Sequence, residues 1–182
     1  MAAPSADFDL DLERDVDLIG RAPHVWYRRA GLGVMAVFVG AALAGLFGQS
    51  PQSRTASGEA AELRIRMPER IRGGLMWAAR IEVEARQRIV APQLVLGSGF
   101  VKGMQLNTIA PAPTSETTRA PGPAGLAPLA WTYPTLEAGD TLTVYLQLQV
   151  DATTVGREDV SISVEGDGID PVRSPATMTV LP

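Results

Sequence analysis

The hydrophobic and polar positions of this chain follow two main patterns, and each predicts a different kind of element. Residues 30–48 contain neither a charged nor a polar side chain. A helix with ~1.5 Å rise per residue extends over ~28 Å in this stretch, close to the ~30 Å hydrocarbon core of a bilayer. The uncharged run therefore predicts a transmembrane helix over residues 30–48.

From residue 61 onward, apolar side chains recur at every second position, which is the period of a half-buried β-strand. The clearest case is 141–150, where the even positions are apolar and the odd positions are Thr, Tyr or Gln. Similar alternation predicts further strands at 62–67, 75–85, 93–96, 104–110, 129–133, 160–164 and 178–180. Seven or eight strands with turn signals between them predict a mostly β domain over 61–182, an antiparallel β-sandwich.

Two details of this pattern make finer predictions. In 104–110 the alternation fails, because Ile109 falls on the face opposite Met104 and Leu106, so we expect a strand end or a bulge near Thr108. Trp77 and Trp131 fall on the apolar faces of their strands. We therefore expect both rings in the core and not on a sugar-binding platform.

The residues before the uncharged run are polar. Every odd position from 7 to 17 is acidic, and most of the even positions are apolar. An isolated strand cannot bury its apolar face, so residues 1–29 are predicted to be an acidic cytoplasmic tail, largely disordered. The alternative is a motif that adds as a strand to the sheet edge of a partner.

The flank of the uncharged run predicts its orientation. Arg28 and Arg29 adjoin the run, and the positive-inside rule places such residues in the cytoplasm. Trp26 and Tyr27 suit the membrane interface. We therefore expect a single-pass signal-anchor in the plasma membrane, with a cytoplasmic N-terminus and an extracytoplasmic domain. A signal peptide cleaved after Ala44 is the alternative.

Small residues recur every four positions in the run, which places them on one helical face: Ala36, Gly40, Ala44 and Gly48. Such a face lets helices approach closely and predicts self-association or packing on another membrane protein. An Ala- and Gly-rich span also contains this spacing by chance. After the run, residues 49–60 are polar and are predicted to be a linker, and the Pro-rich segment 111–128 is predicted to be a long loop, disordered or used for binding.

Composition excludes several classes of chemistry. The chain has no Cys, and its one His precedes the run, so thiol catalysis, disulfides and a His-based triad in the domain are excluded. The net charge of −4 gives no basic footprint for nucleic acid. We expect no enzyme, no cofactor and no nucleic-acid partner.

Charged residues of the domain offer weak candidate sites. Four arginines follow the linker and predict contact with anionic lipid or wall polymer: Arg64, Arg66, Arg70 and Arg72. The alternative is a solvated face on which they pair with nearby Glu residues. Glu165, Asp167 and Asp170 resemble a calcium loop only loosely, so we predict no metal site. Glu82 and Glu84 form a carboxylate pair that could do acid/base chemistry in a cleft, but no cleft is evident, so we predict no catalytic residue.

Four segments carry a resemblance to a known class of domain. They are P-x-L-V-L at 92–96, G-x-x-x-N-x-I at 103–109, W-T-Y at 131–133 and L-x-x-G-x-x-x-x-V at 136–144. In this order they resemble the Ig-like conserved-repeat domains of bacterial envelope proteins. The layout of the whole chain resembles uncharacterised single-pass membrane proteins of actinobacteria. The resemblance implies an Ig-like sandwich and no catalytic residues.

Together these patterns predict a non-enzymatic, membrane-anchored envelope protein. Its partners are expected to be the lipid bilayer and a protein in the membrane or envelope that binds the sandwich. The alternative function is a module that binds carbohydrate or an anionic polymer. An exposed row of aromatic side chains would favour the alternative, and an open strand edge would favour the protein-interaction module.

Overall fold

The computed structural model describes residues 22–44, 50–121 and 127–182. The chain forms two compact units, Met1–Phe47 and Gly48–Pro182. The acidic alternation at 7–17 lies outside the described residues.

The described part of the first unit is the helix α1 (Ala22–Leu43). The predicted tail boundary at residue 29 is wrong, because residues 22–29 belong to this helix. Pro23 is compatible with the early start, since a proline in the first turn breaks no helical hydrogen bond. Residues 45–48 of the predicted span lie outside the described residues. Within the described part of the chain, no helix is both long enough and apolar enough to cross a membrane.

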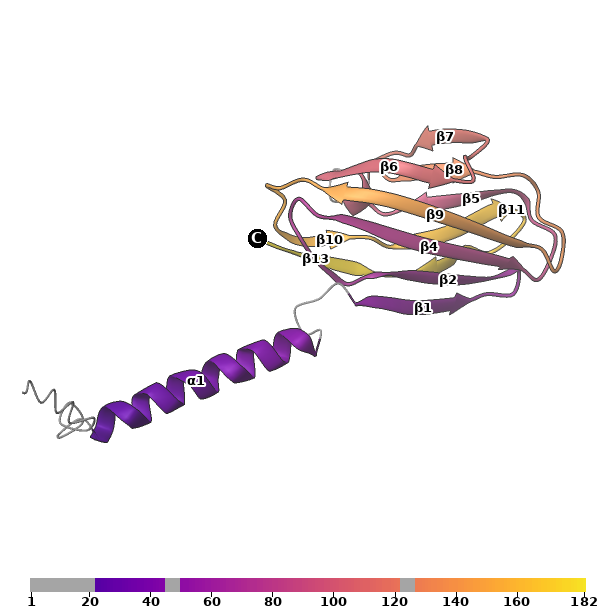
Figure 1. Ribbon diagram of the computed structural model, residues 1–182. Coiled ribbons are helices and arrows are strands. Elements are labelled where there is room, and N and C mark those ends of the chain that lie inside the picture. Colours follow the sequence, from indigo (N-terminus) through magenta and orange to yellow (C-terminus); the bar gives the residue numbers. More distant parts are fainter. Residues whose placement is uncertain (1–21, 45–49, 122–126) are drawn as a thin grey trace, which may run out of the picture. The chain divides into compact units, whose positions relative to one another are not determined.

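The second unit is a β-sandwich with a five-stranded antiparallel sheet on one side, which we call the β9 sheet (Figure 1). Its strands, in spatial order, are β1 (Pro51–Ser57), β2 (Ala61–Pro68), β4 (Met76–Ala85), β9 (Thr141–Val150) and β6 (Met104–Ala110). Every strand pair in this sheet is antiparallel. The prediction of a mostly β, antiparallel sandwich is thus confirmed.

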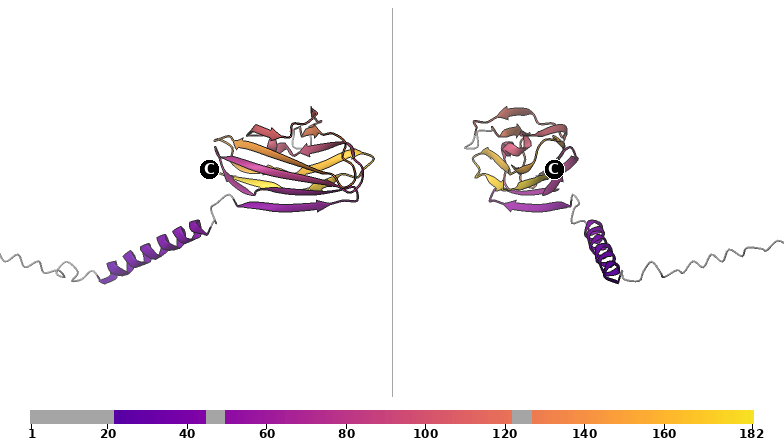
Figure 2. Two further views of the ribbon diagram at one scale, coloured as in Figure 1. Left: turned by 45° about the vertical axis from the view of Figure 1, so that its right-hand side comes forward. Right: turned by 90° about the vertical axis from the view of Figure 1, so that its left-hand side faces the viewer.

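Two further sheets, one of five strands and one of three, lie across from the β9 sheet (Figure 1, Figure 2). The β5 sheet contains, in order, β12 (Val172–Ser174), β11 (Ile162–Asp167), β5 (Val90–Leu96), β8 (Leu129–Thr132) and β7 (Ser115–Thr118). The β13 sheet contains β10 (Gly156–Asp159), β13 (Thr177–Leu181) and β3 (Arg70–Arg72), and in it β13 and β3 run parallel. The 3₁₀ helix η2 (Ser98–Phe100) follows β5.

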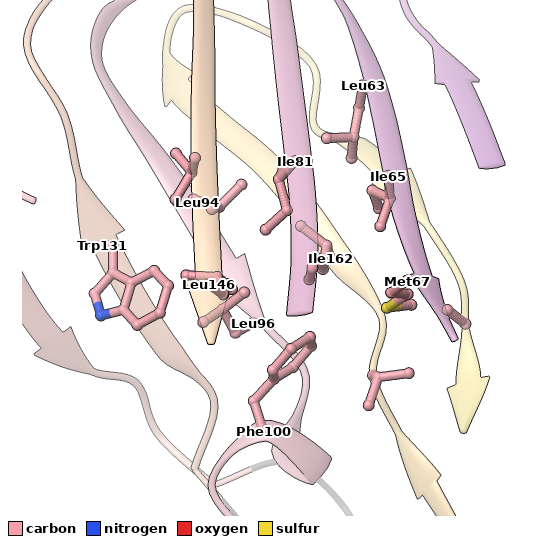
Figure 3. Packing of buried hydrophobic residues seen from close by; sticks show 14 of the residues in the cluster. Leu63, Ile65, Met67, Ile81, Leu94, Leu96, Phe100, Trp131, Leu146 and Ile162 are labelled. Carbon is pink, nitrogen blue, oxygen red and sulfur yellow. The ribbon is translucent and has the colours of Figure 1, made fainter. Parts of the chain in front are cut away.

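The core lies between these sheets. Figure 3 shows Leu63, Ile65, Ile81 and Leu146 of the β9 sheet opposite Leu94, Leu96, Trp131 and Ile162 of the β5 sheet. Trp77 is 4% exposed and Trp131 is 1% exposed, so both are core residues as predicted. Full burial of an aliphatic or aromatic side chain contributes about 1.5–3 kcal/mol, and this cluster therefore supplies most of the driving force for folding.

The number of strands was predicted wrongly, because the described residues contain thirteen. Residues 51–57, predicted to be part of a linker, form β1 and pair with β2 along its whole length. The predicted loop 111–128 contains β7, which pairs with β8. Five strands were missed: β1, β3, β7, β10 and β12. β1, β7 and β10 contain almost no apolar side chains, and β3 and β12 have only three residues each, so none of them carries an alternation that a sequence can reveal.

The irregularity predicted near Thr108 is confirmed. The register between β6 and β9 shifts between Leu106, opposite Leu148, and Thr108, opposite Gln147. Asn107 is therefore the extra residue of a bulge. The shift returns Ile109 to the inner face, opposite the buried Leu146.

Candidate binding surfaces

The structure divides the four predicted arginines between two sheets. Arg64 and Arg66 lie on β2 in the β9 sheet, whereas Arg70 and Arg72 lie on β3 in the β13 sheet. Arg64 pairs with Glu62 at 2.7 Å and with Glu84 at 3.8 Å. The guanidinium of Arg64 is thus engaged with carboxylates, as in the alternative of a solvated face with paired charges.

Glu62 on this face does not have the environment of an acid catalyst. Hydrogen bonds from Arg64 and Arg86 hold the pKa of Glu62 below its usual range, because they stabilise the charged carboxylate. Glu82 pairs with Arg80, and Glu84 lies opposite Glu62 on the neighbouring strand. A general acid near neutral pH needs a raised carboxyl pKa, and Glu62 has the opposite shift.

The outer face of the β9 sheet next to these charges is polar. Tyr145 on β9 is 50% exposed, and the guanidinium of Arg80 lies 5.5 Å from the centre of its ring. Among the described residues of the domain, Tyr145 is the one largely exposed aromatic side chain. The described surface of the domain therefore carries no row of aromatic rings of the kind that binds sugars.

The outer face of the β13 sheet gathers a second group of arginines. Arg157 on β10 lies opposite Thr179 on β13, and Thr179 lies opposite Arg70 on β3. A pocket of about 310 Å³ opens over this row, and its lining residues are Arg54, Glu69, Arg70, Arg157, Thr177 and Thr179. Sequence reasoning missed Arg54 and Arg157, because they lie on strands without an apolar alternation.

A larger groove of about 460 Å³ lies beside β11 and η2. Its main charged groups compensate each other, since Arg119 pairs with Glu165 at 2.6 Å and donates to Gln93 Oε1 at 2.7 Å. Glu165 belongs to the acidic segment 165–170. Among the residues that the structure describes, no group of His, Cys, Asp or Glu is arranged to hold a metal ion.

The edge strand β6 differs from these charged surfaces because it is uncharged. It contains no charged residue and no proline, and Leu106 is 38% exposed on it. Apart from the ladder with β9, no backbone hydrogen bond in the described part of the chain involves residues 104–110. Its outward N–H and C=O groups are therefore available to pair with another strand.

The opposite edge of the same sheet is better protected. β1 begins with Pro51, which has no N–H to donate. Arg54 on β1 pairs with Glu69 and donates to the carbonyl of Pro175 at 3.2 Å, and β12 contacts the strand. Of the two edges of the β9 sheet, β6 is thus the open one.

Most of the residues predicted to orient and pack the helix lie on α1, and Ala44 directly follows it. Trp26, Tyr27, Arg28 and Arg29 are exposed in its first two turns. Ala36 and Gly40 lie one turn apart on one face, and Ala44 donates its N–H to the Gly40 carbonyl at 2.9 Å. Gly48, the last member of the predicted packing face, lies outside the described residues.

No protein-family model matches the sequence, and a search of curated proteins found no match. Several solved structures match the chain at low TM-scores. They include a cohesin module from a family 33 glycoside hydrolase of Clostridium perfringens, with 12% identity, 68% of this chain and 98% of that chain covered, and a TM-score of 0.41. A non-cellulosomal cohesin from the archaeon Archaeoglobus fulgidus has 10% identity, coverage of 62% and 86%, and a TM-score of 0.36.

The C-terminal domain of wzt also matches, with 13% identity, 72% of this chain and 80% of that chain covered, and a TM-score of 0.41. At these values none of the three assigns a function to this chain.

Proposed function

We propose that this chain is a non-enzymatic, membrane-anchored envelope protein whose β-sandwich binds a protein partner at the edge strand β6. The uncharged run at 30–48, which begins on α1 and continues beyond it, supplies the anchor. The N-terminus then lies in the cytoplasm and the sandwich on the extracytoplasmic side. The observation that carries the proposed interaction is the open, uncharged edge of β6.

The distribution of apolar side chains around α1 supports the anchor. Leu32, Val34, Met35, Val37 and Val39 project in different directions at 100° per residue, so they cover all sides of the helix. A helix that is apolar all round is buried in a protein core or a membrane. In the sequence, the uncharged run continues beyond α1 to Gly48, which gives the length of a single span.

The chemistry of an edge strand supports the interaction. A segment of a partner that adds to β6 gains main-chain hydrogen bonds along the strand, and side chains at alternate positions supply specificity. The side chains of Gln105 and Asn107 are exposed and make no hydrogen bond within the described part of the chain, and the exposed side chain of Leu106 is apolar. The occupant we expect is an extended, uncharged segment of another envelope or membrane protein.

Photo-crosslinking in intact membranes tests this proposal. A photoreactive amino acid at Gln105 on β6 should give a discrete crosslinked product in cells that express the full chain. The matched control carries the same amino acid at Thr55, which is exposed on the protected edge strand β1. Equal products from both positions, or none from Gln105, would contradict binding at β6.

Binding of a neutral carbohydrate is the less favoured function, since the described surface of the domain lacks a row of aromatic rings. The arginines on the β13 sheet are a separate observation and lead to a different ligand.

A further inference from the structure

The pocket over the β13 sheet lies on the side of the sheet that faces away from the core. Met178 and Val180 on β13 and Ile71 on β3 are buried, so the residues between them point outward. These outward residues include Thr177 and Thr179, which line the pocket.

The register brings two arginines to opposite sides of one threonine. Arg157, Thr179 and Arg70 occupy equivalent positions on three adjacent strands. Neighbouring strands are ~4.8 Å apart, so the two arginine backbones are separated by roughly 10 Å. Both long side chains can therefore bend towards a single group that sits above Thr179.

The charges around the pocket are unbalanced. Arg54 is paired with Glu69, whereas Arg70 and Arg157 make no ion pair or side-chain hydrogen bond in the described part of the chain. Three arginines against one glutamate leave a net charge of +2 on the pocket lining. The nearest acid on the same face of β10 is Asp159, which accepts the N–H of Ser161 at 3.0 Å.

We propose that this pocket binds a phosphate group. A phosphate monoester carries about −1.5 to −2 charges at pH 7, which matches the charge of the lining. Its tetrahedral oxygens can accept hydrogen bonds from guanidinium groups on two sides and from the hydroxyl of Thr179 below. The group is supplied either by a lipid headgroup or by a soluble phosphate compound. The proposal does not depend on the anchor or on the β6 edge.

Isothermal titration of the full-length chain in detergent with inorganic phosphate, at low salt, tests the pocket. The native chain should show saturable binding of a single phosphate. Arg70→Gln and Arg157→Gln should each weaken binding by about tenfold or more, because each removes charge-assisted hydrogen bonds. Thr179→Val, which keeps the shape of the side chain, should weaken it by a smaller factor.

Arg72→Gln is the matched control, since Arg72 lies on the same strand and is exposed like Arg70 but does not line the pocket. It should change the affinity by about twofold or less, as an exposed charge does through solvent. Thermal unfolding of each variant checks that the fold is intact. Absence of saturable binding to the native chain would overturn the proposal. So would an Arg72→Gln effect equal to that of Arg70→Gln, which indicates diffuse attraction to a basic face.

A second titration identifies the source of the phosphate. The full chain is placed in nanodiscs of phosphatidylcholine, with or without phosphatidic acid. If lipid headgroups occupy the pocket, phosphatidic acid should lower the apparent affinity for inorganic phosphate. An unchanged affinity assigns the pocket to a soluble phosphate compound. In both kinds of nanodisc, the Arg70→Gln chain should still bind inorganic phosphate weakly. Native-like phosphate affinity in that variant would contradict binding at this pocket.

Discussion

Tyr133, the residue after β8, is the side chain whose ionisation the fold most clearly resists. Its ring is buried, its N–H donates to the carbonyl of Pro92 at 2.9 Å, and its hydroxyl donates to the carbonyl of Pro111 at 3.5 Å. Burial raises the pKa of Tyr133 from 10.0 to about 12, because a phenolate loses its hydration in the core. Tyr133 is therefore a core residue whose ionisation should make the stability of the fold depend on pH in alkali.

This shift predicts a loss of stability in alkali. Above pH 10 the unfolded chain releases the Tyr133 proton, while the folded chain keeps it up to about pH 12. The unfolded state then binds fewer protons, so the free energy of unfolding falls as the pH rises through this window, by about 1–2 kcal/mol. Urea unfolding of the native chain and of Tyr133→Phe at a series of pH values measures it. The free energy of unfolding of Tyr133→Phe should fall less between pH 10 and pH 12 than that of the native chain. An identical fall in both proteins would contradict the raised pKa of Tyr133.

At the scale of elements, α1 allows a clean test of its predicted packing face. A Cβ atom built on Gly31 or on Gly40 meets nothing within 4 Å, so neither position restricts a side chain within the protein itself. The two residues are nine positions apart, which places them on opposite sides of the helix. An effect confined to one of them must therefore come from contact with another molecule.

We expect Gly40→Ile to weaken association of the full chain with itself or with another membrane protein. The added side chain separates helix backbones that small residues allow to approach, at a cost of about 1–3 kcal/mol. Gly31→Ile on the opposite face should leave association unchanged. Oligomer state in detergent and energy transfer in membranes measure the effect. Equal association of both variants in both assays would contradict the predicted packing face.

The strands show what the sequence could predict and what it could not. β4 and β9 alternate over ten residues each, and their bounds and inward faces were predicted almost completely. The predicted strand 75–85 begins one residue too early, because Leu75 precedes β4 and is exposed. The polar strands β1, β7 and β10 were missed, since pairing with a neighbouring strand determines their structure and local pattern does not.

The candidate sites, like the strands, could be predicted only in part from the sequence. Arg70 was predicted from its place in the sequence, but its partners in the phosphate pocket could not be. Arg157 is 87 residues away (157 minus 70), and it lies at the same pocket as Arg70 only because β10 and β3 flank β13. The open edge of β6 could not be predicted either, because strand order is a property of the whole sheet.

At the scale of the whole molecule, the absence of cysteine makes the proposed topology simple to test. A single cysteine placed at Ser115, which is exposed on β7, should react with a membrane-impermeant maleimide added to intact cells. A cysteine at Ser5, in the proposed cytoplasmic tail, should react only after the membrane is opened. Labelling in the reverse order, or release of the chain by alkaline carbonate, would contradict the proposed anchor.

The order of strands in the β9 sheet also has a mechanical consequence. The chain enters the domain at β1, and the proposed partner binds at β6, so the two attachment points are opposite edges of one sheet. Tension between them would pass across the strands and load the ladders β1–β2, β2–β4, β4–β9 and β9–β6 in series. Such a connection withstands no more force than its weakest ladder, and the bulged β9–β6 pairing is a natural point of release.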